Sequence, residues 1–155
     1  MARGRAGTPT IENRRAQHDY EILDSLECGI VLLGSEVKSV RAGKVSLAEG
    51  YVVVEGTPPR LTLLGVNIAE YPPAPGAHEP TRSRRLLAHR REIERLARQV
   101  DQKGMTIVPL KVYFREGYAK MLIGLGRGRG KSDKRQRIAE REMQRDIDRA
   151  MTRKR

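Results

Sequence analysis

Residues 20–32 read Tyr20-Glu21-Ile22-Leu23-Asp24-Ser25-Leu26-Glu27-Cys28-Gly29-Ile30-Val31-Leu32 and alternate in polarity along most of their length. The even positions are apolar apart from Asp24, whereas the odd positions include two glutamates and a serine. Because the side chains of a strand point alternately to its two faces, this repeat predicts a strand with one buried face. The polar pair Asp24-Ser25 is the expected interruption, so we predict either two strands or one long bent strand that ends at Gly34.

Four more segments, further along the chain, predict strands. Residues 51–54 are rich in valine, and the Gly-Thr-Pro-Pro turn at 56–59 returns the chain into a strand over 61–68. Alternation recurs at 108–114 and 119–125, on either side of a turn at Glu116-Gly117. Pro109 has no N–H to donate, so we expect an edge position or a bulge there.

A short helix is predicted between Ser35, its expected cap, and Gly43, its expected stop. Three-residue spacing places two valines on one side of this helix and two cations on a neighbouring side, with a third cation just beyond. These residues fit two interpretations equally well: a basic helix that packs on a barrel and faces phosphate, or a capped connector with solvated side chains. The cations are Lys38, Arg41 and Lys44.

A longer helix is predicted over 83–103, because apolar residues recur there at about 3.6-residue spacing among many arginines. The expected fold is therefore mainly β: a small, OB-fold-like closed barrel of about six strands with two or three helices. We predict three parts of the chain: a flexible basic arm (1–15), an OB-like barrel (16–126) and a basic C-terminal tail (127–155).

The charge is concentrated at the two ends of the chain. The net charge is +12 over 155 residues, with a pI near 10.4. Residues 127–155 contribute +7 and residues 1–15 contribute +3, which leaves a nearly neutral body. Such a surplus indicates a polyanionic partner, with nucleic acid ahead of an anionic membrane, although solubilising tails would give the same composition.

No set of residues predicts an enzyme, a cofactor or a metal site. Cys28 is the only cysteine, and the three histidines lack metal-ligand spacing. The His18-Asp19 pair is interpreted as structural. The glycines at 124, 126, 128 and 130 fit no phosphate-loop motif, so we interpret 126–130 as a flexible hinge. Without a signal segment or an apolar run long enough to cross a bilayer, a cytoplasmic monomer is expected.

Several stretches resemble one known family. They are Asn13-Arg14-Arg15-Ala16 with His18-Asp19-Tyr20, then Glu27-Cys28-Gly29-Ile30, the segment Gly34-Ser35-Glu36-Val37-Lys38-Ser39-Val40-Arg41-Ala42-Gly43-Lys44, residues 79–87, and Lys131-Ser132-Asp133-Lys134-Arg135. In this order and spacing they resemble the SsrA-binding protein family, also called small protein B, of bacterial trans-translation. The resemblance covers the chain from about Asn13 to its last residue.

The resemblance implies that the barrel is the RNA-binding part and binds the tRNA-like domain of transfer-messenger RNA. It also implies that the tail is disordered when free and becomes helical in the empty mRNA channel of a stalled ribosome. There the tail would lie near the decoding centre and its small-subunit rRNA. Elongation factor Tu would be an indirect partner, held through the RNA. The positions that match the family's RNA-binding surface are Tyr20, Glu27, Lys38, Arg41, Lys44, Leu87 and Lys120, and the adjoining motifs add Asn13, Arg84 and Arg85.

The tail positions that the resemblance assigns to the ribosome are Arg129, Lys131, Ser132, Asp133, Lys134 and Arg135. Ser132 departs from the family pattern, which has His or an aromatic residue before Asp-Lys-Arg. Further along, Ile138, Met143, Ile147 and Met151 form a narrow apolar stripe, which fits a helix that forms on binding or one that packs on the body.

Two other functions fit parts of the sequence. An OB-fold RNA chaperone or ribosome-assembly protein would have the same barrel and basic ends. A peripheral membrane protein would use the tail as an amphipathic helix, although a stripe with no aromatic residue makes a poor membrane face.

Overall fold

The computed structural model describes residues 8–102, 104–128 and 145. The predictions for residues 1–7 and for the tail beyond Gly128 therefore fall almost entirely outside the described residues. The elements are β1 (Ile11–Glu12), α1 (Arg14–Asp19), β2 (Tyr20–Ile30), α2 (Gly34–Arg41), β3 (Val45–Ser46), β4 (Tyr51–Glu55), β5 (Arg60–Leu64), β6 (Asn67–Ile68), β7 (Arg84–Leu87), α3 (Arg90–Val100), β8 (Met105–Arg115) and β9 (Tyr118–Gly128).

Six antiparallel strands close into a ring in the order β8-β4-β5-β7-β2-β9, and β9 pairs back onto β8. One edge of β8 pairs with β9 along its length, while the other pairs first with β4 and then with the short β1. A separate two-stranded sheet joins β3 and β6. The predicted fold class, a mainly β closed barrel of about six strands with two or three helices, is confirmed.

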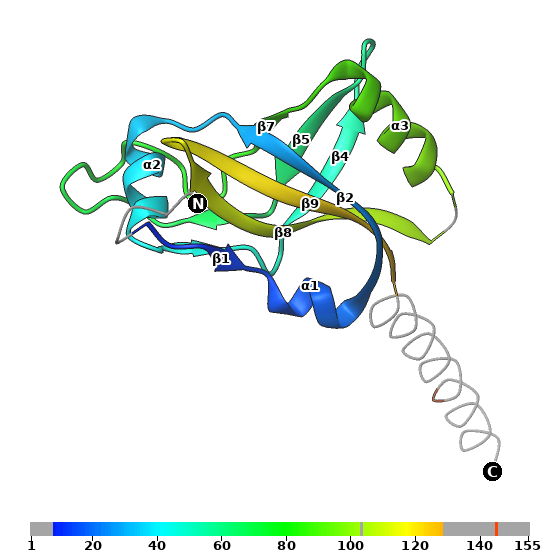
Figure 1. Cartoon of the computed structure of the whole chain (residues 1–155). Helices are drawn as coiled ribbons and strands as arrows, with labels where there is room; N and C mark the ends of the chain where they lie inside the picture. The colour runs from blue at the N-terminus through cyan, green and yellow to red at the C-terminus, as the bar shows by residue number, and fades with distance from the viewer. Residues whose placement is uncertain (1–7, 103, 129–144, 146–155) are drawn as a thin grey trace.

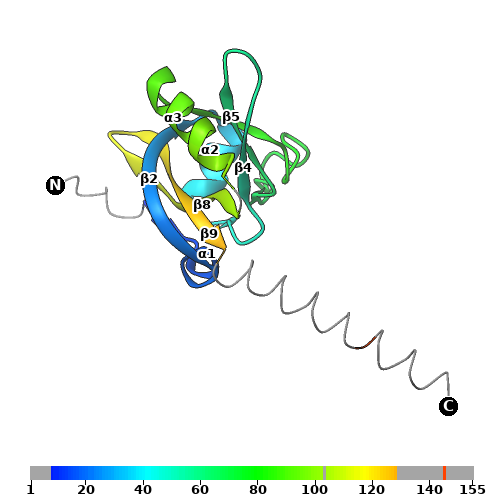
Figure 2. The same cartoon turned by 90° about the vertical axis from the view of Figure 1, so that its right-hand side faces the viewer.

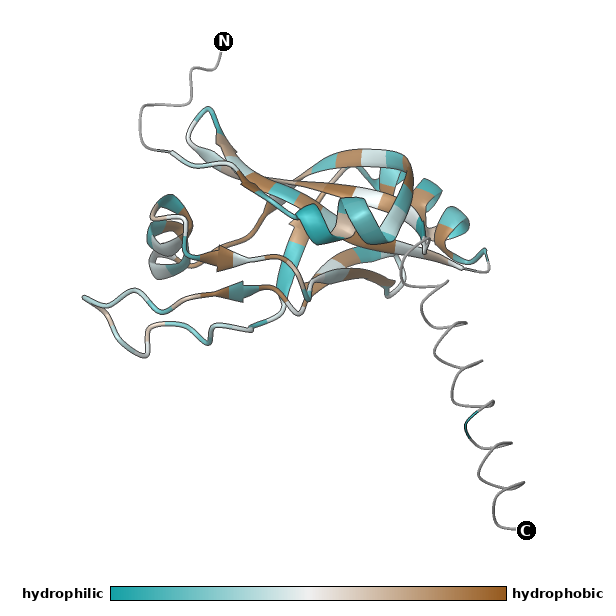
Figure 3. Cartoon of the chain, turned by 90° about the horizontal axis from the view of Figure 1, so that it is seen from below, coloured by the Kyte–Doolittle hydropathy of each residue, from teal (hydrophilic) through white to brown (hydrophobic). Residues whose placement is uncertain are grey.

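The main hydrophobic core fills the ring, and two helices lie at its ends (Figures 1 and 2). Helix α2 contributes Val40 to this core, and α3 contributes Ile93 and Leu96. Along the strands, hydrophobic and hydrophilic residues alternate in Figure 3, as expected where one face is buried. The ring is therefore a packed core that leaves its outer face for binding.

A bulge at Leu23 divides β2 into two parts that bury opposite faces. The register with β9 shifts between Ile22 and Asp24, so β2 is one long irregular strand, the second of the two predicted forms. After the bulge, Leu26 and Cys28 point into the main core. Before it, Ile22 points to the outer side and joins a second, small hydrophobic cluster under α1. One extra residue is what reverses the face.

The glycines near the end of β9 are packing residues of this second cluster. Gly124 and Gly126 are buried in the strand. A Cβ atom on Gly124 would lie 2.8 Å from Leu110, and one on Gly126 would lie 3.0 Å from the Cβ of Tyr20. The predicted hinge at 126–130 is therefore wrong for Gly126 and Gly128, which pair with β2; Gly130 lies outside the described residues.

Two predicted elements have different limits in the structure. The helix predicted over 83–103 is in fact the strand β7 followed by the helix α3. Leu86 fits a two-residue repeat as well as a helical one, and it pairs with Leu61 of β5. The strand predicted over 61–68 breaks at Gly65, whose φ of +77° ends β5 before β6. Pro109, as predicted, lies at a bulge.

Residues 11–15, predicted as part of a flexible arm, are ordered parts of the barrel. Asn13 caps α1 by accepting a hydrogen bond from the Ala16 N–H at 3.1 Å. Its amide donates to the carbonyl oxygens of Leu47 (3.2 Å) and Pro109 (2.8 Å). His18 and Asp19 lie in the last turn of α1 and not at the start of a strand.

A buried ion cluster connects α2 to the start of β7 and the residues just before it. Glu36 is 0% exposed and Arg84 is 1% exposed. Arg84 Nε donates to Glu36 Oε2 at 2.7 Å, and Arg82 donates to Oε1 at 2.6 Å. Arg84 also donates to the carbonyl oxygens of Val66 and Pro80. Every charge in the cluster is thus paired inside the fold, as burial requires.

Glu36 also sets the start of α2, where Ser35 was expected to act as the cap. Its carboxylate accepts from the Leu33 N–H at 2.8 Å, so Leu33 is the capping position. Ser35 instead contacts His78, whose Nε2–H donates to the Ile68 and Ala69 carbonyl oxygens, leaving Nδ1 to accept from the serine hydroxyl. Burial alone would raise the pKa of Glu36, but hydrogen bonds from Arg82, Leu33 and Arg84 outweigh it, and the pKa is lowered.

The substitution Glu36→Gln is expected to destabilise the protein by about 3–5 kcal/mol, because it leaves a buried guanidinium without its counter-charge. Urea unfolding at pH 7 measures this. The control is Glu94→Gln, which removes only the exposed Arg90–Glu94 pair and should cost less than about 1 kcal/mol. Equal losses of unfolding free energy in the two variants would contradict a stabilising role for the buried cluster.

The pH dependence supplies a second measurement on the same pair of variants. Because folding lowers the pKa of Glu36 from its ordinary 4.5, its contribution is fully present above that value and is lost as the pH falls through the lower, folded pKa. The stability of Glu36→Gln should accordingly fall less between pH 5 and pH 2 than that of the parent protein.

Candidate nucleic-acid interface

One row of outer-face residues crosses four strands of the barrel. Leu87 of β7 pairs with Gly29 of β2, Gly29 pairs with Lys120 of β9, and Lys120 pairs with Tyr113 of β8. Their sequence neighbours point into the core, so this row points outward. Gly29 adds no side chain to the row. Leu87 is 49% exposed, which leaves an apolar surface beside a cation.

Glu27 lies two residues before this row on the same face of β2, held by two partners from β8. The Tyr113 hydroxyl donates to the Glu27 carboxylate, and Arg115 Nη1 donates to both Glu27 oxygens, at 2.9 and 3.0 Å. The hydrogen bond from Tyr113 is the main reason that the pKa of Glu27 is lowered. Glu27 is therefore a fixed, ionised acceptor whose side chain remains 30% exposed.

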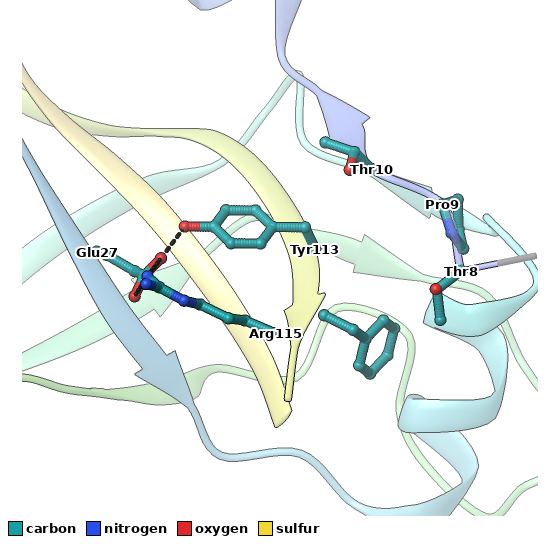
Figure 4. A pocket seen from close by; sticks show the side chains of 7 residues that line it. Thr8, Pro9, Thr10, Glu27, Tyr113 and Arg115 are labelled. Atoms are coloured by element: carbon teal, nitrogen blue, oxygen red, sulfur yellow. Dashed lines mark hydrogen bonds and ion pairs between the residues drawn. The ribbon is translucent and has the colours of Figure 1, made fainter. Parts of the chain in front are cut away.

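A pocket of about 410 Å³ is lined by Glu27, by residues 8–10 and by the end of β8 (Figure 4). Figure 4 shows Tyr113 and Arg115 reaching toward Glu27 on one side, with residues 8–10 on the other. Phe114, which also lines this pocket, lies under Arg41 of α2. The Phe114 ring therefore links the pocket beside Glu27 to the basic helix, although the two come from separate elements.

The cations of α2 lie over aromatic rings. Lys38 Nζ is 5.1 Å from the centre of the Tyr71 ring, and Arg41 Cζ is 5.4 Å from the centre of the Phe114 ring, within the range of a cation–π contact. Lys44 is exposed just after the helix. These three cations stand outside the buried ion cluster and are free to meet phosphate.

Three of the predicted RNA-contact residues lie elsewhere. Asn13 and Arg84 are buried at 4% and 1% exposure, and their polar atoms are used inside the fold, so neither reaches the outer surface. Tyr20 lies at the far end of β2, opposite Gly128, where it packs on the second hydrophobic cluster. Arg85 is exposed on the outer face of β7, next to Leu87.

Sequence reasoning missed four residues that shape this surface. They are Tyr71, Tyr113, Phe114 and Arg115. Only Tyr113 and Arg115 carried a signal, because their alternation with core residues of β8 places them on the outer face. Their contacts with Glu27 depend on the order of the strands, in which β9 lies between β2 and β8. Tyr71 comes from a loop with no periodic pattern.

The described residues contain neither a metal-ligand cluster nor a membrane-spanning helix. Nowhere in residues 8–102 and 104–128 are three His, Cys, Asp or Glu side chains grouped so that they could hold a metal ion. Of the helices in the described part of the chain, none has the length and apolar character needed to span a bilayer. The surface combines cations, one fixed acceptor and an apolar strip, which suits a folded RNA with phosphate, hydroxyl and sugar groups.

Comparison with known proteins identifies related chains. Residues 10–153 match the family model described as SmpB protein. The chain is 50% identical over 144 residues to an SsrA-binding protein of Microcystis aeruginosa (strain NIES-843 / IAM M-2473), covering 92% of each chain. It is 51% identical over 156 residues to an SsrA-binding protein of Roseiflexus sp. (strain RS-1), covering 97% of this chain and 96% of the other.

A solved structure is similar as well. It is described as "tmRNA-SmpB: a journey to the center of the bacterial ribosome", and the superposition has a TM-score of 0.64 at 51% sequence identity. The alignment covers 77% of this chain and 84% of that chain.

The contact between Tyr113 and Glu27 can be measured through the titration of the phenol. Burial and the hydrogen bond to Glu27 raise the pKa of Tyr113 to about 12. In Glu27→Gln the negative charge is gone, so this pKa should fall toward 10, while the burial contribution remains. The absorbance difference between each protein and its Tyr113→Phe derivative isolates this one phenol. Glu21→Gln, a change elsewhere on β2, should leave the pKa near 12; a similar fall in both variants would contradict the contact.

Proposed function

The chain belongs to the SmpB protein family, and from this premise we propose that it binds the tRNA-like domain of transfer-messenger RNA and carries that RNA to stalled ribosomes for trans-translation. It is a binding protein and not an enzyme. The observation that carries the proposal is the outer-face row with Glu27, which the Phe114 ring links to the α2 cations although these residues lie far apart in the sequence.

This surface divides the contacts with the RNA by chemistry. Lys38, Arg41 and Lys44 bind backbone phosphates, which position the RNA without reading its sequence. Glu27 accepts hydrogen bonds from base or ribose donors, and Leu87 packs on sugar. Lys120 adds a phosphate contact at the centre of the row. Such a mixture recognises a folded RNA by its shape and its 2′-hydroxyl groups.

The C-terminal tail acts on a second RNA surface. We assign Arg129, Lys131, Ser132, Asp133, Lys134 and Arg135, which lie outside the described residues, to the small-subunit rRNA near the decoding centre and the empty mRNA channel. Strand β9 ends at Gly128 beside Tyr20, whereas Leu87 and Lys120 lie opposite Gly29. The nine residue steps from Tyr20 to Gly29 span about 30 Å of strand. One end of the barrel can therefore hold the carried RNA while the tail leaves from the other.

Elongation factor Tu joins this assembly through the RNA, without a surface of its own on the barrel. The complex acts on ribosomes in the cytoplasm, and one copy of the chain suffices, because the interface is complete within one barrel.

Removing two α2 cations in Lys38→Ala/Arg41→Ala should weaken binding of the isolated tRNA-like domain. The slope of log affinity against log salt should become shallower by about two, since each phosphate contact contributes about one. The control is Arg91→Ala/Arg98→Ala, which removes the same charge from the exposed face of α3. Fluorescence anisotropy measures both at several salt concentrations. If the parent protein binds an unrelated RNA hairpin equally well, it is a general RNA chaperone instead.

Truncation before Lys131 should leave affinity for the tRNA-like domain within about threefold, because the barrel surface is intact, and should abolish tagging of stalled nascent chains. A reconstituted translation reaction on an mRNA without a stop codon measures tagging. Loss of RNA binding on truncation would contradict the division of labour between barrel and tail.

A further inference from the structure

Three of the few aromatic residues in this chain contact charged side chains of the interface. The sequence has five tyrosines, one phenylalanine and no tryptophan. Tyr71 contacts Lys38, Phe114 contacts Arg41, and Tyr113 contacts Glu27. The charged partners all belong to the surface described above, whereas the three rings come from two other parts of the chain.

Tyr71 lies in the loop after β6, and this loop is held firmly near α2. The His78 imidazole binds the carbonyl oxygens of Ile68 and Ala69 and contacts Ser35 of α2. The hydroxyl of Ser39, also on α2, donates to Ala69 at 2.7 Å. The loop on either side of Tyr71 is therefore tied to the helix that carries Lys38, which keeps the ring beneath the ammonium group.

Tyr113 and Phe114 are adjacent near the end of β8, and their side chains lie on opposite faces of the strand. Phe114 is partly buried and packs against the main core, so its ring is fixed where Arg41 lies over it. Tyr113 points to the outer face and donates its hydroxyl hydrogen to Glu27. One strand end thus fixes a cation of α2 and the acceptor of β2 at the same time.

We propose that Tyr71, Phe114 and Tyr113 are positioning residues that hold Lys38, Arg41 and Glu27 in their RNA-binding orientations before the RNA arrives. The proposal rests on the proposed function. Free lysine and arginine side chains lose rotamer freedom when they are immobilised at an interface, and that loss weakens binding. Side chains already held over rings lose less. The charges do the binding, and the rings make it tighter by limiting where the charges can be.

Double-mutant cycles on RNA affinity test this, with the isolated tRNA-like domain as the probe. Tyr71→Leu should weaken binding about two- to tenfold, the effect of immobilising one side chain. In the Lys38→Ala background the same change should have almost no effect, because there is no cation left to position. Tyr71→Phe keeps the ring and should bind like the parent protein. Phe114→Leu with Arg41→Ala, and Tyr113→Phe with Glu27→Gln, form the matching cycles.

The control is Tyr51→Leu, which removes a ring that is 46% exposed at the start of β4, a strand with no residue in the proposed interface. It should change neither affinity nor its salt dependence. Urea unfolding of every variant separates loss of folding from loss of binding, and the comparison within each cycle corrects for any general effect of Phe114→Leu on the core.

The outcomes are distinct. Equal losses from Tyr71→Leu with and without Lys38 would overturn the positioning role and indicate that the ring stacks on a base instead. A loss from Tyr71→Phe as large as that from Tyr71→Leu would overturn it as well. If Lys38→Ala leaves RNA affinity unchanged, the proposed interface itself fails, and the positioning role fails with it.

Discussion

The buried carboxylate of Glu36 is the constraint on which the arrangement of the functional surface depends. A charge with no exposure must be paired, and its partners are Arg84, the first residue of β7, and Arg82, two residues before it. The same carboxylate accepts the Leu33 N–H and so sets where α2 begins. One ionised side chain thus fixes the helix that carries the interface cations against the strand that carries Leu87.

The barrel adds a second constraint, the change of face along β2. After the bulge, the strand buries Leu26 and Cys28 and presents Glu27 outward. Before it, the outer side is occupied by α1 and the small cluster around Ile22, which Gly124 and Gly126 make room for. The outer face is therefore divided between an end covered by packing and an end open to a partner. The proposed interface lies at the open end, and β9 reaches Gly128 at the other.

Charge within the interface is arranged locally. The nearly neutral body of the chain would not attract RNA by its total charge, so affinity must come from a few cations placed together. Lys38 and Arg41 achieve this from a single helix, over rings that come from a loop and from β8. The ionised Glu27 disfavours a polyanion that offers only phosphates. It suits an RNA that also offers hydrogen-bond donors from bases or riboses.

The sequence by itself determined the class of fold and indicated several of the residues that form the proposed interface. Two-residue alternation identified β2, β8 and β9, and valine content with a turn motif identified β4 and β5. The basic side of residues 34–44 was visible from helical spacing alone, because all of these patterns are local. The tertiary structure decided what depends on contacts between distant segments. It assigned residues 84–87 to a strand by pairing Leu86 with Leu61, and it buried Arg84 and Asn13. It also placed two glycines of an apparent hinge in β9, where Gly126 is a packing site. It also brought Tyr71 to Lys38 and Tyr113 to Glu27. No periodicity encodes these contacts, because each joins residues from elements that only the closed barrel makes neighbours.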